Sequence, residues 1–298
     1  MLKQPIKTLL FATSLMFIIN VNAADPKELA ESEVPEWQTI KTLMFGDRYI
    51  RTGKQSAITL SINPDIDDAS TVPIHVDGLV NQKDQPYIKT LHIIVDQNPI
   101  PTAAVFELSP SAGNLHLATR LRIEKYTFVR AVAETSDGQL HMDYKWVAVK
   151  GGCSAPSGKN AGSDPLLGKM KVTFNKYRNS YKNENGEKVF RVPLEQPNVV
   201  KVQVRHPNES ALAVDLDEAV SPNFIQELTV GFADENVLSA QVNFSISDNP
   251  AFTFSFSPKR EGDLSLTVKD THENTFTQSI SVVKAKKNRT KQVVWSTR

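Results

Sequence analysis

The side chain best suited to chemistry in this sequence is the thiol of Cys153, the only cysteine of the chain. Gly151 and Gly152 precede it, and Ser-Ala-Pro-Ser-Gly follows it. We expect no neighbouring side chain to shield the thiol, because glycine has none and leaves the backbone free to enter a narrow opening. The pattern predicts a thiol that is presented to other proteins. The alternative is a chance surface cysteine in a linker.

The N-terminus predicts export from the cytoplasm. Two lysines are followed by an apolar stretch over residues 9–19 and by Val-Asn-Ala at 21–23, which fits a small-residue cleavage site. We expect residues 1–23 to be a signal peptide, with an uncleaved membrane anchor as the alternative, and the mature protein to lie in the periplasm. That compartment is oxidising. Since one cysteine cannot form an internal disulfide, Cys153 is either inert or available to react with another molecule.

Charge and composition exclude several classes of partner. The chain of 298 residues has 34 Lys and Arg against 33 Asp and Glu, a formal net charge of +1. Because the predicted signal peptide carries basic residues and no acid, the mature chain is also close to neutral. This balance argues against nucleic-acid or membrane binding through bulk charge. After the signal peptide, no apolar run approaches the roughly 20 residues of a membrane span.

The other residue types that could do chemistry form no recognisable motif. The sequence has no Cys-x-x-Cys, no His-Glu-x-x-His and no Gly-rich phosphate loop, so we expect no metal and no cofactor. The six histidines are scattered at positions 75, 92, 116, 141, 206 and 272, and the first four lie in strand patterns where packing explains them better than metal binding. A cysteine hydrolase needs a histidine held beside Cys153, and a flexible arm is a poor place to hold one. We therefore expect a protein that is not an enzyme.

The elements that must position Cys153 are predicted to be β-strands. Alternation with period two predicts seven short strands before it, at residues 58–62, 72–76, 88–95, 103–108, 114–123, 126–134 and 140–149. Between the last two, Asp137-Gly138 is a strong hairpin signal. Ahead of them, the spacing of Trp37, Ile40, Leu43 and Met44 predicts a short helix that ends at Gly46. This set of strands favours a β-sandwich.

A second strand-rich region follows Cys153. Residues 151–165 hold four glycines and two prolines and are predicted to be a flexible linker. Beyond them, alternation predicts strands at 198–207, 223–232, 237–246, 251–257, 263–270 and 275–283. The alternating Phe252, Phe254 and Phe256 are typical of a core-facing strand. The sequence thus predicts an all-β chain with a first sandwich over 24–150 and a second over 166–298.

Several segments resemble the two subunits of a sulfur carrier. Four segments resemble SoxY, the sulfur-carrier subunit of periplasmic thiosulfate oxidation: VPIHVDG, LHIIVDQNPIPTAAVFELSP, LATRLRIEKYTFVRAVAETSDGQLH and VKGGCSAP. Four further segments resemble its partner SoxZ: VQVRHPNESALA, PNFIQELTVGFADENVLSAQV, NPAFTFSF and EGDLSLTVKD. As a fusion in the order SoxY then SoxZ, the chain is most similar to the quinoprotein dehydrogenase-associated SoxYZ-like carriers.

The resemblance implies a fold, a site and partners. Both halves would be immunoglobulin-like antiparallel sandwiches that associate within one chain as SoxY and SoxZ do between chains. Cys153 matches the carrier cysteine, which holds sulfur intermediates covalently for partner enzymes such as c-type cytochromes or hydrolases. Gly151 and Gly152 match the glycines before it, whereas Ser154-Ala155-Pro156 replaces the second Gly-Gly of the C-terminal SoxY motif, and here the arm is tied at both ends. The alternative is an accessory or binding protein of a periplasmic quinoprotein (PQQ) alcohol dehydrogenase system, with the thiol incidental.

Overall fold

The computed structural model describes residues 34–63, 66–154, 164–174, 180–210, 212 and 221–285. The predicted signal peptide, residues 155–163 of the predicted linker and most of the basic C-terminal tail lie outside the described residues. Within the described part of the chain, no helix is both long enough and apolar enough to span a membrane. We refer to residues 34–154 as the first half and to residues 164–285 as the second half.

The first half consists of one short α-helix, two 3-10 turns and a series of strands. They are α1 (Pro35–Phe45), β1 (Ile50–Arg51), η2 (Gly53–Gln55), β2 (Ile58–Ile62), β3 (Val72–Gly78), β4 (Ile88–Val95), β5 (Thr102–Leu108), η3 (Pro110–Ala112), β6 (His116–Leu121), β7 (Thr127–Thr135) and β8 (Leu140–Val147). The seven predicted strands and the predicted helix are therefore confirmed. Gly138, with φ 81°, lies in the predicted hairpin between β7 and β8.

The second half consists of strands in its described residues. They are β9 (Met170–Phe174), β10 (Ser180–Lys182), β11 (Lys188–Val192), β12 (Asn198–Val204), β13 (Ile225–Phe232), β14 (Glu235–Val242), β15 (Ala251–Phe256), β16 (Gly262–Asp270) and β17 (Thr275–Lys284). The six predicted strands are confirmed. Strands β1, β9, β10 and β11 were not predicted, and they lie at or near sheet edges. With two and three residues, β1 and β10 are too short to show alternation, whereas β9 alternates much as β2 does and its pattern was present in the sequence.

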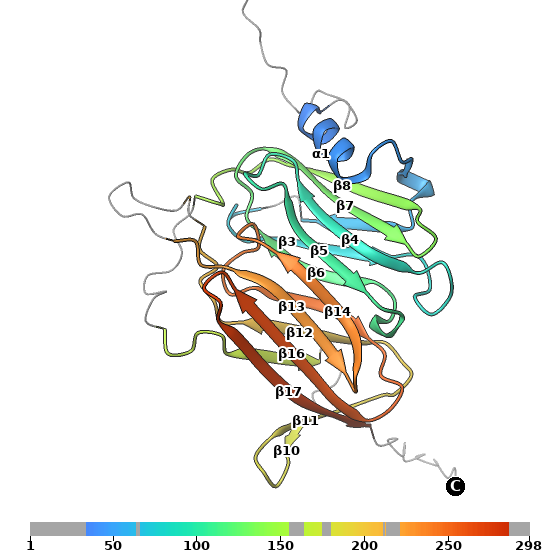
Figure 1. Ribbon diagram of the computed structural model, residues 1–298, viewed down its shortest axis with the longest axis vertical. Helices are drawn as coiled ribbons and strands as arrows, with labels where there is room; N and C mark the ends of the chain where they lie inside the picture. The colour runs from blue at the N-terminus through green and yellow to red at the C-terminus, as the bar shows by residue number, and fades with distance from the viewer. Residues whose placement is uncertain are drawn as a thin grey trace, which may run out of the picture.

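The strands form two sheets, and each sheet runs through both halves (Figure 1). One sheet has the order β1-β8-β7-β4-β5-β14-β13-β16-β17-β11-β10, and the other has the order β2-β3-β6-β15-β12-β9. The halves meet edge to edge where β5 pairs antiparallel with β14, from Ala104↔Val242 to Leu108↔Leu238. In the smaller sheet β6 meets β15 at Ala118↔Thr253. The two sandwiches are thus joined by a shared backbone ladder, which we call the seam.

A single hydrophobic core extends across the seam between the two sheets. Phe106 of β5 packs against Phe252 of β15 from the other half, with ring centroids 6.3 Å apart. Phe252, Phe254 and Phe256 are all buried, as their alternation predicts. Burial of each such ring contributes about 1.5–3 kcal/mol relative to exposure. The two halves therefore stabilise each other through apolar contact as well as through the ladder.

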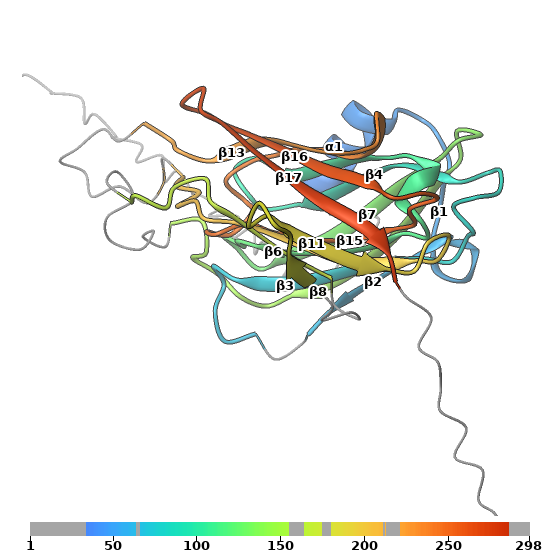
Figure 2. The ribbon, with the colours of Figure 1, turned by 90° about the horizontal axis from the view of Figure 1, so that it is seen from below.

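Helix α1 covers the outer face of the larger sheet, over β7 and β8 (Figure 1). Figure 2 shows α1 on one side of the molecule and β2 and β3 on the opposite side. Trp37 of α1 stacks on the guanidinium of buried Arg130, 4.3 Å from its ring centroid, and Arg130 forms an ion pair with Asp96 at 2.7 Å. The aromatic face of Trp37 and the buried carboxylate of Asp96 together stabilise the charge of Arg130. The helix thereby fixes the strands that lead to Cys153.

Candidate functional site

The segment after β8 that carries Cys153 folds back along the loop between β6 and β7. The amide of Gly151 donates to the carbonyl of Glu124, and the amide of Gly152 donates to the carbonyl of Ile123, each at 2.9 Å. On its other side, Ile123 donates its own amide to Ala69 at 2.8 Å. Backbone groups away from regular sheets need such partners when they are shielded from water. The start of the predicted linker is therefore a fixed part of the fold in this conformation.

Both glycines are needed for the path of this segment. A Cβ atom on Gly152 would lie 2.0 Å from the carbonyl oxygen of Ala69 and 2.7 Å from the nitrogen of Ile123, so no side chain fits. Gly151 has φ 82°, in the left-handed region that favours glycine. In the described conformation the two glycines allow a close approach of backbones. Their predicted role in arm flexibility stays a prediction.

The thiol of Cys153 is buried, with 0% of the residue exposed, and the expectation of an exposed thiol is wrong for this conformation. Its Sγ lies 3.8 Å from the carbonyl oxygen of Arg122, and Ser245 of the second half also interacts with the thiol. The hydroxyl of Ser210, also in the second half, donates to the carbonyl of Cys153 at 2.6 Å. The cysteine therefore lies at a polar junction between the halves.

Glu124 holds the end of this segment through its carboxylate. Its Oε2 accepts hydrogen bonds from the amides of Cys153 at 2.9 Å and Ser154 at 3.1 Å, while Oε1 accepts from the Ser154 hydroxyl at 3.1 Å. Hydrogen bonds to an ionised acceptor are roughly twice as strong as those between neutral groups. Glu124 was not predicted as a site residue, because 29 residues separate it from Cys153 and no local pattern links the two.

The surroundings of Cys153 suppress its reactivity in this conformation. Burial, and then the negative charge of Glu124, raise the pKa of Cys153 to about 12. The Arg122 cation and the Ser245 hydroxyl act in the opposite direction, without outweighing burial. The thiolate is the nucleophile in thiol chemistry. At neutral pH this thiol is therefore protonated and shielded from solvent.

Arg122 connects the Cys153 loop to the second half. Its guanidinium donates to the backbone carbonyls of Asn208 and Phe244, the latter at 3.1 Å. Arg122 is only 3% exposed, and burial lowers the pKa of its guanidinium. A buried cation needs acceptors of this kind. Here they come from the second half, so the loop over Arg122 and Glu124 is shaped by both halves together.

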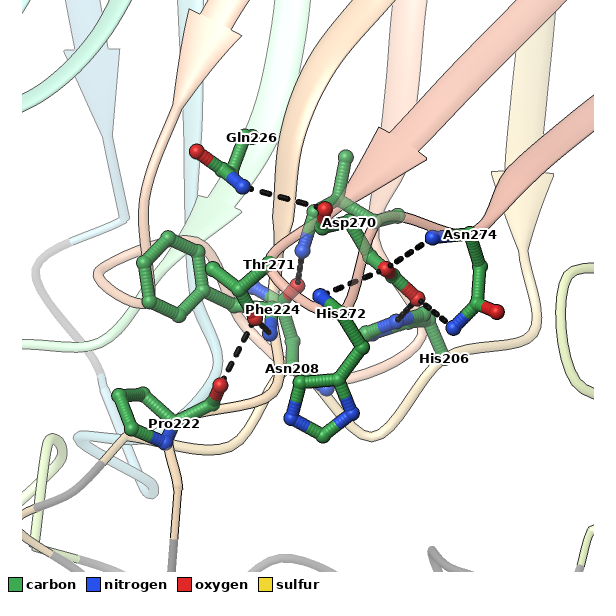
Figure 3. Close-up of polar contacts among 10 residues, drawn as sticks. His206, Asn208, Pro222, Phe224, Gln226, Asp270, Thr271, His272 and Asn274 are labelled. Carbon is green, nitrogen blue, oxygen red and sulfur yellow. Dashed lines mark hydrogen bonds and ion pairs between the residues drawn. The ribbon is translucent and has the colours of Figure 1, made fainter.

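A buried polar cluster in the second half supports Asn208 (Figure 3). The amide of Asn208 donates to Nδ1 of His206 at 3.1 Å, which leaves Nε2 of His206 to donate to Asp270 at 3.4 Å. The Asp270 carboxylate also accepts from the amides of His272 and Asn274, each at 2.9 Å. Burial lowers the pKa of His206, so its ring is neutral at pH 7. His206 thus positions Asn208, which in turn holds Arg122.

Apart from His272, whose amide donates to Asp270, the other histidines lie away from this cluster. His116 contacts Asp77 at 2.7 Å, His141 accepts from the amide of Ala57 at 3.1 Å, and the ring of His92 meets the ring of Phe45 edge-on. His75 is exposed on β3. Among the described residues there is no group of three or more His, Cys, Asp or Glu side chains arranged to hold a metal ion.

Two family models match the chain in tandem. Residues 41–153 match the sulfur oxidation protein SoxY, and residues 189–281 match the sulphur oxidation protein SoxZ. The first match ends at Cys153 itself. Fold and site together define a double immunoglobulin-like β-sandwich with one cysteine at the junction of its halves. The chain belongs to the SoxY and SoxZ sulfur-oxidation proteins, as a fusion of the two.

Solved structures resemble the chain only weakly. The fibronectin(III)-like modules of Clostridium thermocellum CbhA match with 10% identity and a TM-score of 0.22, over 76% of this chain and 94% of that chain. A glycosyl hydrolase family 2 member from Bacteroides cellulosilyticus DSM 14838 matches with 8% identity and a TM-score of 0.22, over 75% and 28%. Dimeric latent PorU from Porphyromonas gingivalis matches with 11% identity and a TM-score of 0.24, over 78% and 24%. The matched part is thus a minor share of the two larger proteins. No curated protein matches the chain.

Proposed function

We propose that the protein is a periplasmic, non-enzymatic carrier that holds sulfur intermediates covalently on Cys153 while partner enzymes act on them. The observation that carries the proposal is the tandem SoxY and SoxZ match, whose first part ends at this single cysteine. The periplasmic location rests on the predicted signal peptide. Partner enzymes of the sulfur-oxidation type, with c-type cytochrome or hydrolase chemistry, would load and unload the thiol.

Loading by a thiosulfate-type cargo is an oxidative conjugation. The thiol of Cys153 loses its proton, and a new sulfur–sulfur bond forms between Sγ and the outer sulfur of thiosulfate. The product is Cys153–S–S–SO₃⁻, and two electrons pass to the partner enzyme, whose c-type cytochrome would accept them. The protein contributes the thiol and the means of hiding or presenting it. Because the buried thiol is protonated at neutral pH, the segment must open before loading.

Intact-mass analysis of the protein from its own host tests this proposal. During growth on thiosulfate we expect sulfur adducts that peptide mapping places on Cys153, and none on a Cys153→Ser variant. The adducts should disappear under reducing conditions, because the cargo is held through a sulfur–sulfur bond. If the native protein carries only the free thiol throughout sulfur-supplied growth, the carrier function is rejected.

Burial of Cys153 favours one alternative, in which the thiol is incidental. The protein would then be an accessory or binding protein of a periplasmic quinoprotein alcohol dehydrogenase system, and its sandwiches would provide the binding surface. In that case Cys153→Ser should leave dehydrogenase activity and growth on the alcohol unchanged. A strong growth defect caused by this single substitution, in a variant that folds like wild type, would exclude the alternative, because serine has the same branching as cysteine and lacks its sulfur chemistry.

A further inference from the structure

The contacts around Cys153 assign a positioning role to Glu124. We propose that Glu124 is a latch that holds residues 151–154 closed over the buried thiol, and that its release exposes Cys153 to partner enzymes. The biological purpose of the latch rests on the proposed carrier function. The latch itself is a property of the free protein that needs no cargo.

Four consecutive amides define the closed segment. Those of Gly151 and Gly152 donate to backbone carbonyls of the loop opposite, whereas those of Cys153 and Ser154 both donate to the Glu124 carboxylate. The second pair therefore depends on one side chain. The hydroxyl of Ser154 adds a third bond to the same carboxylate. Removal of this one group leaves the amides of Cys153 and Ser154 without their acceptor, so that the end of the segment is held mainly by the hydrogen bond from the Ser210 hydroxyl to the carbonyl of Cys153.

The latch lies at the surface, although the thiol beneath it is buried. Ser154 is exposed and Glu124 is half-buried, whereas Cys153 is fully buried. Water can take over the hydrogen bonds of exposed groups when they separate, so the net cost of breaking them is modest. The segment can thus open without disturbing the seam, which is made by other strands.

The closed conformation favours the bare thiol over a loaded one. Sγ is already 3.8 Å from the carbonyl of Arg122, and the Gly152 backbone lies against Ala69 too closely to retreat. A cargo ending in a sulfonate would add a negative charge in this buried place, where burial and the charge of Glu124 together outweigh the attraction of the Arg122 cation, as they do for the thiolate. A loaded Cys153 should therefore stay outside, and an unloaded one should return under the latch.

The test compares wild type with Glu124→Ala and Glu124→Gln, and uses Glu184→Ala as a matched control. Glu184 is an exposed glutamate in the β10–β11 turn of the second half. Two readouts are needed: hydrogen exchange of a peptide that covers residues 151–154, and the rate at which iodoacetamide alkylates Cys153. In Glu124→Ala we expect both rates to rise at least about tenfold. Glu184→Ala should match wild type.

The pH profile of alkylation separates a latch from a general structural role. In wild type, the midpoint should lie between the ordinary thiol pKa of 9.0 and the closed-state pKa of about 12, because deprotonation and opening are coupled. Glu124→Ala should move this midpoint towards 9.0, since opening becomes easier and a repelling charge is removed. A variant that only loosens the fold would instead raise exchange in β7 and β8 as well.

Each outcome bears on the latch. Unchanged exchange and alkylation in Glu124→Ala would overturn it. If that variant does not fold, Glu124→Gln decides, because it keeps the volume and one acceptor oxygen and should give a smaller increase in both rates. Sulfur adducts on Cys153 in the host, combined with no effect of either substitution, would support the carrier and reject the latch. An effect of both substitutions without adducts would support the latch and reject the carrier.

Discussion

The two halves of the molecule are connected in two physically different ways. At the seam, β5 and β14 share a backbone ladder above a continuous apolar core. At the Cys153 junction, the contacts are polar and come from side chains such as Glu124 and Ser210. Apolar groups lose the free energy of burial when they meet water, whereas water can replace the hydrogen bonds of the exposed Ser154 to Glu124, although the bond from Ser210 to Cys153 is buried. The seam therefore does not depend on the Cys153 segment, and the two halves would remain one body if that segment moved.

The largest expected effect is on the seam. Phe252→Ala should lower the free energy of unfolding by about 3–5 kcal/mol, because it removes a fully buried ring that packs against Phe106 of the other half. Urea denaturation followed by tryptophan fluorescence measures this change. Leu43→Ala, at a position that is 81% exposed, is the control and should change little. A small effect of Phe252→Ala would show that the core does not join the halves.

Gly152→Ala should break the junction without breaking the seam. The added Cβ would lie 2.0 Å from Ala69, so residues 151–154 must move, and alkylation of Cys153 should rise at least about tenfold. Gly151→Ala is the matched control, because a Cβ there meets nothing within 4 Å and costs only the strain of its positive φ, about 1 kcal/mol. Equal alkylation rates in the two variants would contradict the close approach at Gly152.

The buried His206 predicts a pH dependence of stability. Its pKa in the folded protein lies below the ordinary value of 6.5, so the unfolded chain binds the proton more readily. The contribution of neutral His206 to the free energy of unfolding is therefore fully present above pH 6.5, and it is lost as the pH drops towards the folded-state pKa. His206→Asn should reduce the slope of the free energy of unfolding against pH by up to about 1.4 kcal/mol per pH unit. Denaturation curves between pH 5 and 7.5 measure the slope in wild type and in the variant, and equal slopes would contradict the prediction.

The smallest expected effect is that of cutting the chain between the halves. A protease site placed between Ser154 and Asp164 should leave both pieces associated after cleavage, since the seam does not depend on that connection. Size-exclusion chromatography at micromolar concentration should show one species of unchanged size. Two separate species would mean that only the covalent connection raises the local concentration enough to keep the halves together.

The strands of the fold could be predicted from the sequence in large part, but the site could not. Residues such as Ile58, Leu60 and Ile62 alternate with polar neighbours, and that local pattern is enough to place β2. Edge strands such as β10 have three exposed residues and no such pattern. The composition around Cys153 indicated exposure, yet Gly152 serves a tight approach to Ala69. Glycine permits both uses, and its neighbours along the chain do not reveal which applies.

By itself, the sequence determined the all-β class, the tandem of two sandwich halves and the identity of the single thiol, because alternation and residue type are local properties. The tertiary structure alone decided that the halves share one core and that this thiol is buried under Glu124. Glu124 and Ser210 lie 29 and 57 residues from Cys153 along the chain. Such partners meet only when strand pairing brings distant loops together, and the pKa of Cys153 follows from that meeting.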